Sequence, residues 1–98
     1  KSYALEEKVG IVREYAFEKA TDRGGRATFD YDDVIYEIFD GKPSADHAYK
    51  LMRLAAQARG FTYRENKRPM ELAVDAREAR RGAVFSSAKN SVSEGSGL

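Results

Sequence analysis

The sequence predicts an α+β domain that is mostly helical, with three helices around one core and a small β-hairpin. Three observations predict it. Apolar residues recur at helical spacing in three segments within the first sixty residues. A tight break, Asp40-Gly41-Lys42-Pro43, separates the second segment from the third. Two short runs of alternating apolar and polar residues, 61–64 and 70–74, then follow and are typical of paired strands.

The first helix is expected from Tyr3 to Asp22, with Ser2 as its cap. Gly24-Gly25 should end it, because glycine accepts the left-handed conformation that follows a helix end. Its apolar stripe recurs at spacings of three and four and comprises Leu5, Val9, Ile11, Val12, Tyr15, Ala16 and Ala20. The extended run 26–29 comes next and is too short to form a sheet by itself.

Asp30 is expected to cap the second helix, with Asp32 and Asp33 in its first turn, where carboxylates favour the helix dipole. Its apolar residues match the α-helical template at i, i+3, i+4, i+7 and i+8: Tyr31, Val34, Ile35, Ile38 and Phe39. In the turn that follows, Gly41 supplies unusual backbone angles and Pro43 disfavours a helical residue before it.

Ser44 is expected to cap the third helix, which should run over residues 44–59 and stop at Gly60. Its inner face is predicted to hold Ala45, Ala48, Tyr49, Met52, Ala55 and Ala56. After the hairpin, a short helix is expected over residues 75–81. We therefore expect one domain over residues 1–85 and a mobile Ser/Gly-rich tail over residues 86–98.

Length and composition suit one globular domain. The chain has 98 residues, of which 42% are hydrophobic and 34% charged, and it has no cysteine. Disulfides, zinc sites built on thiolates and cysteine nucleophiles are thereby excluded. No apolar run is long enough to span a bilayer and no signal-peptide pattern opens the chain, so we expect a cytoplasmic protein with no membrane partner.

Positive charge is concentrated in one stretch, although the net charge of the whole chain is only +1. Residues 1–43 are net negative, whereas residues 44–69 hold six Lys/Arg and two acids. That stretch covers the third helix and the hairpin loop. A basic stretch of this kind suits a polyanionic partner.

The order helix, short strand, helix, tight turn, helix, hairpin over residues 3–81 resembles the winged helix-turn-helix superfamily. The stretch GKPSADHAYKLMRLAAQARGF is similar to a recognition helix that leads into a wing strand. The resemblance implies that the helix over residues 44–59 enters a major groove and that the wing over residues 61–74 contacts the DNA backbone. No sequence motif selects a family within the superfamily.

The candidate DNA contacts follow from this placement. Lys50 and Arg53 lie three residues apart on the outer side of the helix, and Ser44 and His47 lie near its N-terminus, where backbone N–H groups favour a phosphate. Lys67 and Arg68, together with Arg64, are expected to supply positive charge at the loop tip. The full set is Ser44, His47, Lys50, Arg53, Gln57, Arg64, Lys67 and Arg68.

Other readings compete with these contacts. The basic stretch could instead be a solvent-exposed helix face and a polar loop with no partner. His47 could be an exposed helix residue with no special role. A helix cap explains the aspartates near Asp30 better than a metal or acid/base site does. Core packing explains the aromatic residues better than stacking on bases does: Tyr31, Phe39, Tyr49, Phe61 and Tyr63.

The function that the sequence favours is sequence-specific binding of double-stranded DNA, as in a small transcriptional regulator or a plasmid or viral accessory factor. The alternative is a winged helix that docks an acidic protein. No catalytic residue, metal ligand or cofactor is expected. A homodimer through the first helix or the C-terminal segment stays open, with Ala76, Ala79, Val84 and Phe85 as the C-terminal candidates.

Overall fold

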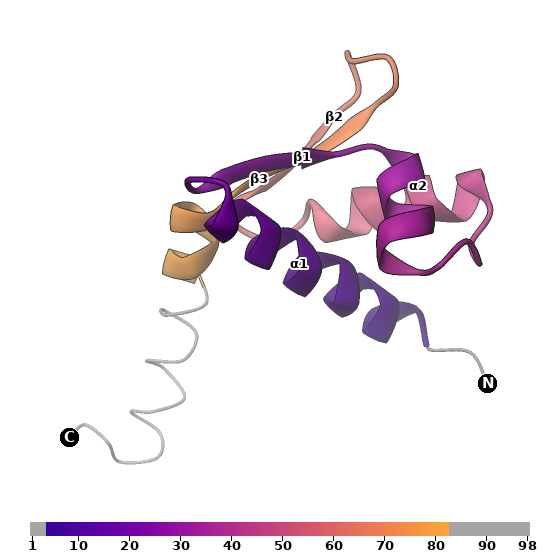
Figure 1. Ribbon diagram of the computed structural model, residues 1–98, viewed down its shortest axis with the longest axis horizontal. Coiled ribbons are helices and arrows are strands. Elements are labelled where there is room, and N and C mark those ends of the chain that lie inside the picture. The colour runs from indigo at the N-terminus through magenta and orange to yellow at the C-terminus, as the bar shows by residue number, and fades with distance from the viewer. Residues whose placement is uncertain (1–3, 83–98) are drawn as a thin grey trace.

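The computed structural model describes residues 4–82 and shows an α+β fold that is mostly helical, with a small three-stranded antiparallel sheet (Figure 1). Its elements are α1 (Leu5–Asp22), β1 (Arg26–Phe29), η1 (Asp33–Ile38), α2 (Ala45–Ala55), β2 (Phe61–Arg64) and β3 (Glu71–Asp75), followed by helical residues 76–82. The predicted fold class is therefore confirmed at this level. Within the described residues, no helix is long and apolar enough to cross a membrane.

Helix α1 buries the stripe that the spacing predicted, with Val9, Val12, Ala16 and Ala20 in the core. Leu5 was expected on the same stripe but is 38% exposed, because the first turn extends past the core. Ala4 occupies the N-cap position and its N–H donates to Glu7 Oε1 at 2.9 Å. Ser2, the expected cap, lies outside the described residues, as does Tyr3.

The run 26–29 is not an isolated extended piece but the edge strand β1, which pairs with β3 in the order β1-β3-β2. The register joins Arg26 to Asp75 and Phe29 to Leu72. Ala27 and Phe29 point into the core, whereas Arg26 and Thr28 stay exposed. The hairpin expected from the sequence is thus part of a three-stranded sheet.

The second helix has its expected cap. Asp33 N–H donates to Asp30 Oδ1 and Asp30 N–H donates to Asp33 Oδ2, both at 3.0 Å, which is a reciprocal cap. The α-helical expectation is wrong for residues 33–38, which form a π-helix in which Phe39 N–H donates to Val34 O at 3.3 Å. The wider turn leaves Val34 and Ile35 buried and Ile38 half-buried.

The turn after η1 falls where the sequence placed it. Asp40 and Gly41 both have positive φ, 62° and 88°, which stops the helix. Ser44 is the N-cap of α2 and its Oγ accepts a hydrogen bond from His47 N–H at 3.2 Å.

Helix α2 ends at Ala55, four residues before the expected end. Residues 56–60 form turns instead, with Gln57 N–H donating to Leu54 O at 3.1 Å and Ala58 N–H to Ala55 O at 3.3 Å. Its inner face also differs from the prediction: Leu51 is fully buried, while Ala45 is exposed. The tighter last turn moves the chain toward β2.

The two strands of the hairpin lie close to their predicted bounds, and β3 begins at Glu71 rather than Met70. Asp75 Oδ1 accepts from the N–H groups of Arg77 and Glu78, at 3.0 and 3.2 Å, so it caps the expected C-terminal helix. Ala76 and Ala79 are buried within their own domain. Val84, Phe85 and the predicted tail lie outside the described residues.

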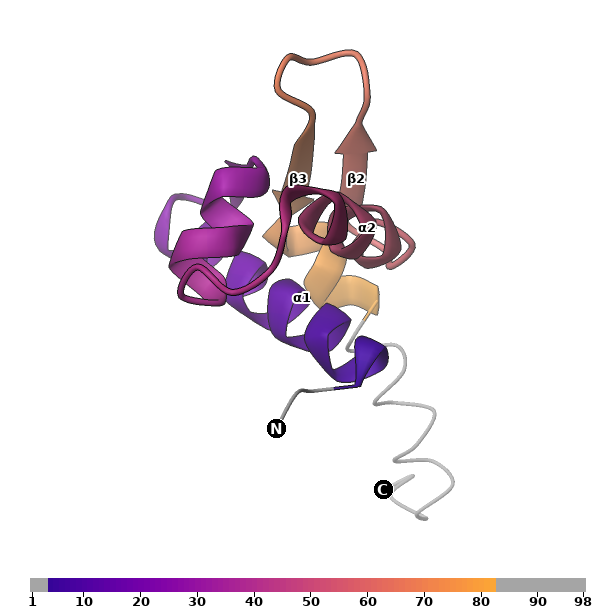
Figure 2. The ribbon, with the colours of Figure 1, turned by 90° about the vertical axis from the view of Figure 1, so that its right-hand side faces the viewer.

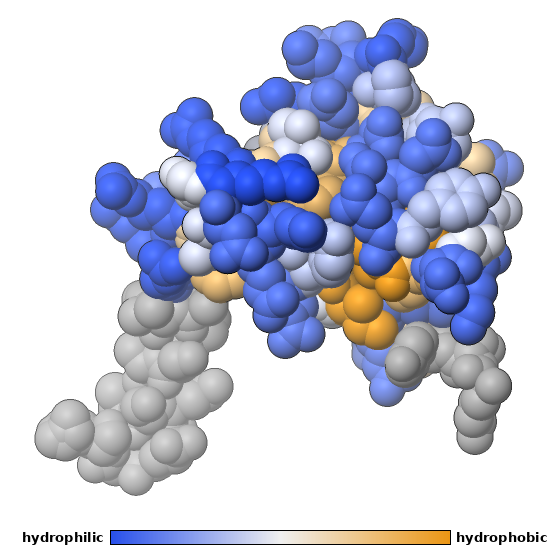
Figure 3. Space-filling view, in the orientation of Figure 1, coloured by the Kyte–Doolittle hydropathy of each residue, from blue (hydrophilic) through white to orange (hydrophobic). Residues whose placement is uncertain are grey.

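One core joins these elements, and α1 runs along one face of the sheet (Figure 1). Its largest fully buried side chains are Leu51, Met52, Leu72, Val12 and Val34. Four of the five aromatics assigned to the core are half-buried against it, and Phe61 is buried. The surface seen in Figure 3 is mostly hydrophilic, with its hydrophobic area gathered near α1 and the helix that contains η1.

We expect Gly60→Ala to destabilise the domain strongly. Gly60 has a φ of +90°, and an added Cβ would meet the backbone N of Ala79 and lie 2.6 Å from its Cα. The left-handed conformation costs an alanine about 1–2 kcal/mol, and the overlap adds roughly 1–3 kcal/mol. Chemical denaturation of both proteins measures the loss.

Gly24→Ala is the matched control, because Gly24 has a φ of +80° but no atom within 4 Å of an added Cβ. Its free energy of unfolding should fall only by the cost of the left-handed conformation, about 1–2 kcal/mol. Equal losses in the two variants would show that Gly60 is not in close contact with the C-terminal helix.

Candidate nucleic-acid interface

Helix α2 buries one face and presents the opposite face to solvent. Ala48, Leu51, Met52 and Ala55 are fully buried. The opposite positions 46, 50 and 53 are exposed, and at 3.6 residues per turn they fall within roughly 60° of arc. Gln57 is exposed in the turn after the helix. Asp46, Lys50, Arg53 and Gln57 therefore line the outer side of this element.

The C-terminal end of α2 is held by an arginine from α1. Arg13 Nη2 donates to Leu54 O at 2.8 Å, and Arg13 Nε donates to Ala55 O at 3.1 Å. Helix ends carry carbonyl groups without intrahelical partners, and a cation there also suits the helix dipole. Arg13 thus fixes where α2 ends and how it sits on α1. Sequence reading missed this residue because its partners are more than forty positions away.

The N-terminal side chains of α2 serve the fold rather than a free surface. The hydroxyl of Ser44 is engaged as the helix cap. His47 is half-buried, and its Nε2 lies 3.3 Å from Lys8 Nζ of α1. Because an ammonium group only donates, this contact suits a neutral imidazole that accepts at Nε2. His47 therefore faces α1, away from the outer line of α2.

Burial of the His47 imidazole lowers its pKa below the usual value, and the positive charges of Lys8 and Lys50 lower it further. The folded state thus favours the neutral ring. Because the unfolded state then binds more protons, stability declines as the pH falls through the ordinary histidine range.

The loop between β2 and β3 projects beyond the rest of the protein (Figures 1 and 2). Its tip is organised by Arg68, whose Nη1 donates to Glu65 O at 2.7 Å and to Lys67 O at 2.9 Å. Tyr63 Oη, 3.2 Å from Met70 Sδ, links the two sides of its base. Lys67 is exposed at the tip. Arg68 therefore shapes the loop while Lys67 presents free charge.

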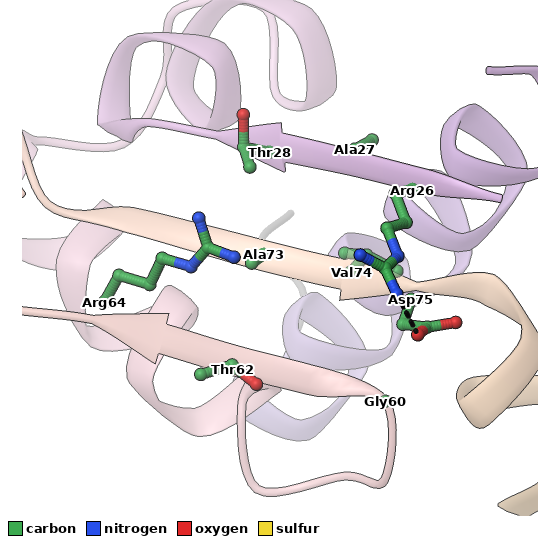
Figure 4. Close-up of a pocket in the computed structure, with 9 residues that line it drawn as sticks. All are labelled: Arg26, Ala27, Thr28, Gly60, Thr62, Arg64, Ala73, Val74 and Asp75. Carbon is green, nitrogen blue, oxygen red and sulfur yellow. Dashed lines mark ion pairs between the residues drawn. The ribbon is translucent and has the colours of Figure 1, made fainter. Parts of the chain in front are cut away.

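Arg64 does not join the cations at the tip, where the sequence had grouped it. It ends β2, and its side chain lies across the outer face of the sheet over Ala73 (Figure 4). Arg64 Nη1 is 3.8 Å from Glu71 Oε1, its register partner on β3. The groove there, about 500 Å³, is also lined by Arg26, Thr28 and Thr62. Cross-strand pairing thus directs Arg64 away from the tip.

Most cations in residues 4–82 are engaged within the protein. Arg26, Arg59, Arg64 and Arg81 form ion pairs, Lys8 contacts His47, and other cations bind carbonyl groups or lie over aromatic rings. Over the described residues, those without such a contact are Arg23, Lys42, Lys50, Arg53, Lys67 and Arg77. Four of these six lie on the turn before α2, on α2 and on the hairpin loop.

The acidic residues around Asp30 do not gather as a metal site. Asp30 and Asp33 cap the helix, and Glu37 Oε1 accepts from Tyr15 Oη at 3.0 Å. In the part of the chain that the structure describes, no group of three or more His, Cys, Asp or Glu residues is arranged to hold a metal ion. Partial burial raises the pKa of Asp33, as does the negative charge of Asp30 and Glu37.

Comparison with known protein families, with curated proteins and with solved structures finds no match to this chain.

We expect Arg13→Leu to destabilise the protein by about 1.5–3 kcal/mol, because two carbonyl groups at the end of α2 lose a charged donor. Urea unfolding followed by circular dichroism measures it. Arg23→Leu, at the exposed C-cap arginine of α1, is the control and should change stability by less than about 0.5 kcal/mol. Equal effects would mean that Arg13 does not hold α2.

We expect Lys8→Met to raise the pKa of His47 toward its usual value, since a positive neighbour is removed while burial remains. Titration of the imidazole signals by NMR measures this, and His47 is the single histidine of the chain. Lys42→Met removes a cation that does not contact His47 and should leave the pKa unchanged. An unshifted or lowered pKa in Lys8→Met would argue against the α1–His47 contact.

Proposed function

We propose that this chain is a winged helix-turn-helix domain that binds duplex DNA sequence-specifically, as small transcriptional regulators do. The observation that carries the proposal is the set of free cations on one turn, one helix and one projecting loop: Lys42, Lys50, Arg53 and Lys67. A major groove accepts an α-helix, and phosphates attract exposed Lys and Arg.

The element order and sheet support the winged-helix part of this proposal. A helix, a short strand and two helices precede the hairpin, and the first strand pairs with the last. In winged helices the third helix lies in the major groove and the hairpin contacts the backbone beside it. In this chain those elements are α2 and the β2–β3 hairpin, which carry the free cations.

The structure refines which residues we assign to the DNA. Lys50, Arg53 and Gln57 are exposed on the outer side of α2 and are our candidates for base contacts. Lys42 and Lys67 are our candidates for phosphate contacts, with Arg68 shaping the loop. Three residues of the sequence-based set are not proposed as direct contacts, because their side chains are already engaged. Ser44 caps α2, His47 contacts Lys8, and Arg64 pairs with Glu71.

The test measures binding of the full chain to a random-sequence duplex and to a duplex selected from a random library, over a range of salt concentrations. Lys50→Ala and Arg53→Ala should each cost roughly 1–3 kcal/mol on the selected duplex and less on random DNA if the residue reads a base. Lys67→Ala should weaken binding to both duplexes alike and reduce the log–log salt slope by about 0.9 if one phosphate contact is lost.

The control is the Arg59→Ala/Arg81→Ala double variant, which removes two arginines that pair with Glu78 on another part of the surface. It should bind both duplexes like the parent. If Lys50, Arg53 and Lys67 are all replaced by alanine, and the folded variant binds DNA as tightly as the parent at every salt concentration, the proposal fails. Docking of an acidic protein would then be the better account of this surface.

A further inference from the structure

A second cationic surface lies at the end of the sheet that is away from the hairpin loop. There the end of α1, the turn into β1 and the start of the C-terminal helix surround a hollow of about 360 Å³. In Figure 1 this end and the loop lie in opposite halves of the molecule. The lining residues that carry the argument are Thr21, Arg26, Asp75, Arg77 and Arg80.

Three arginines and one carboxylate give the hollow a positive balance. Asp75 is already engaged, since its Oδ1 accepts two backbone N–H groups and its Oδ2 lies 3.7 Å from Arg26 Nη2. Arg77 is exposed and forms no ion pair with a carboxylate of residues 4–82. Arg26 is thus paired with Asp75, whereas Arg77 and Arg80 form no ion pair with a carboxylate of the described residues.

Within the described residues, Arg80 contacts an aromatic ring and its side chain forms no hydrogen bond. Its guanidinium carbon lies 5.5 Å from the centroid of the Phe17 ring. A contact through the face of a guanidinium leaves the N–H groups at its edge available. Phe17 thus positions the charge of Arg80 beside the hollow, and no acceptor within residues 4–82 engages the N–H groups of its side chain.

The hollow and the proposed DNA surface are separated by the length of the sheet. The Arg26–Asp75 register pair closes one end, and the Arg64–Glu71 pair lies at the other end, next to the loop. Asp75 lies four positions after Glu71 on β3, which is about 14 Å at the rise of a strand. The hollow and the loop that carries Lys67 therefore lie at opposite ends of this sheet.

We propose that the hollow binds phosphates of a second DNA duplex, so that one chain bridges two DNA segments. The inference rests on the proposed function, in which the first duplex lies on α2 and the hairpin loop. Guanidinium groups match phosphate oxygens in geometry and charge, and arginine binds them with two N–H groups. The lining offers no apolar pocket for the side chains of an acidic peptide, which favours the nucleic-acid backbone.

The experiment uses a biotinylated 30-base-pair duplex on beads, the full chain, and a fluorescent duplex of random sequence as the second partner. The parent should capture the fluorescent duplex. Arg77→Ala/Arg80→Ala should bind the first duplex within about two-fold of the parent and capture the second roughly ten-fold less. The log–log salt slope of that capture should fall by about 0.9 for each lost phosphate contact.

Arg77→Glu alone serves as a second variant that should leave the fold intact. The Arg77 side chain is exposed and forms no ion pair within the described residues, whereas Arg80 lies over Phe17. Arg77→Glu should reduce capture at least as much as the double variant does. Arg59→Ala/Arg81→Ala removes the same number of charges from arginines that Glu78 engages and should capture like the parent. Analytical ultracentrifugation of each protein without DNA measures its oligomeric state, and a dimer would mean that two chains rather than one join the duplexes.

Parent-level capture by both Arg77 variants would overturn the inference, as would a parent that binds the first duplex and captures no second one. If the parent binds no duplex, the proposed function and the inference both fail. If the Lys50 and Arg53 variants bind like the parent while the Arg77 variants lose DNA altogether, the hollow is the main DNA site and α2 is not.

Discussion

The pairing of β3 with strands on both sides is the constraint on which the rest of this structure depends. β1 comes before the middle helices and β2 comes after them, and β3 joins both in antiparallel register. Residues 30–60 are thereby closed into one large loop that starts and ends on the sheet. Leu72 and Val74 of β3 are almost completely buried. With its ends fixed in this way, the middle of the chain packs α2 against α1 and the sheet, and the loop at residues 65–70 projects freely.

Contacts between α1 and α2 then decide which face of α2 is available. Arg13 of α1 binds the carbonyl groups at the C-terminal end of α2, and Lys8 of α1 approaches His47 near the N-terminal end of α2. Between them, Leu51 and Ala55 are fully buried. One helix thus holds the other at both ends and along its length. Rotation of α2 would break these contacts together, so the outer line that carries Lys50 and Arg53 is set by the packing of the opposite side.

The sequence predicted the features that depend on neighbouring residues. The Asp30 and Ser44 caps, the break at Gly41, the strand parity of Phe61 and Leu72, and the exposure of Lys50 and Arg53 all follow from spacing or local geometry. Features that depend on distant partners were missed. The early end of α2 depends on Arg13, and the orientations of His47 and Arg64 depend on Lys8 and Glu71. β1 became a strand only because β3, more than forty residues later, supplies its hydrogen bonds. The π-helix at residues 33–38 has no signal in the apolar pattern, which fits an α-helix equally well.

The net charge of +1 says little about the partners of this protein, because opposite charges are engaged in different ways. Glu71 balances the charge of Arg64, and Glu78 balances one of the two charges of Arg59 and Arg81, so part of their field cancels at a distance. The acids near Asp30 lie at the start of the helix that contains η1, where the helix dipole offsets part of their charge. An approaching polyanion is therefore attracted mainly by charges that have no partner. The electrostatic potential at a surface depends on such local charges more than on the net charge of the chain. Of the cations without a partner in the described residues, four lie on the turn before α2, on α2 and on the hairpin loop, and Arg77 lies at the hollow. If the proposed function is right, two such surfaces on a chain of little net charge would attract phosphates without the general self-repulsion of a strongly cationic chain.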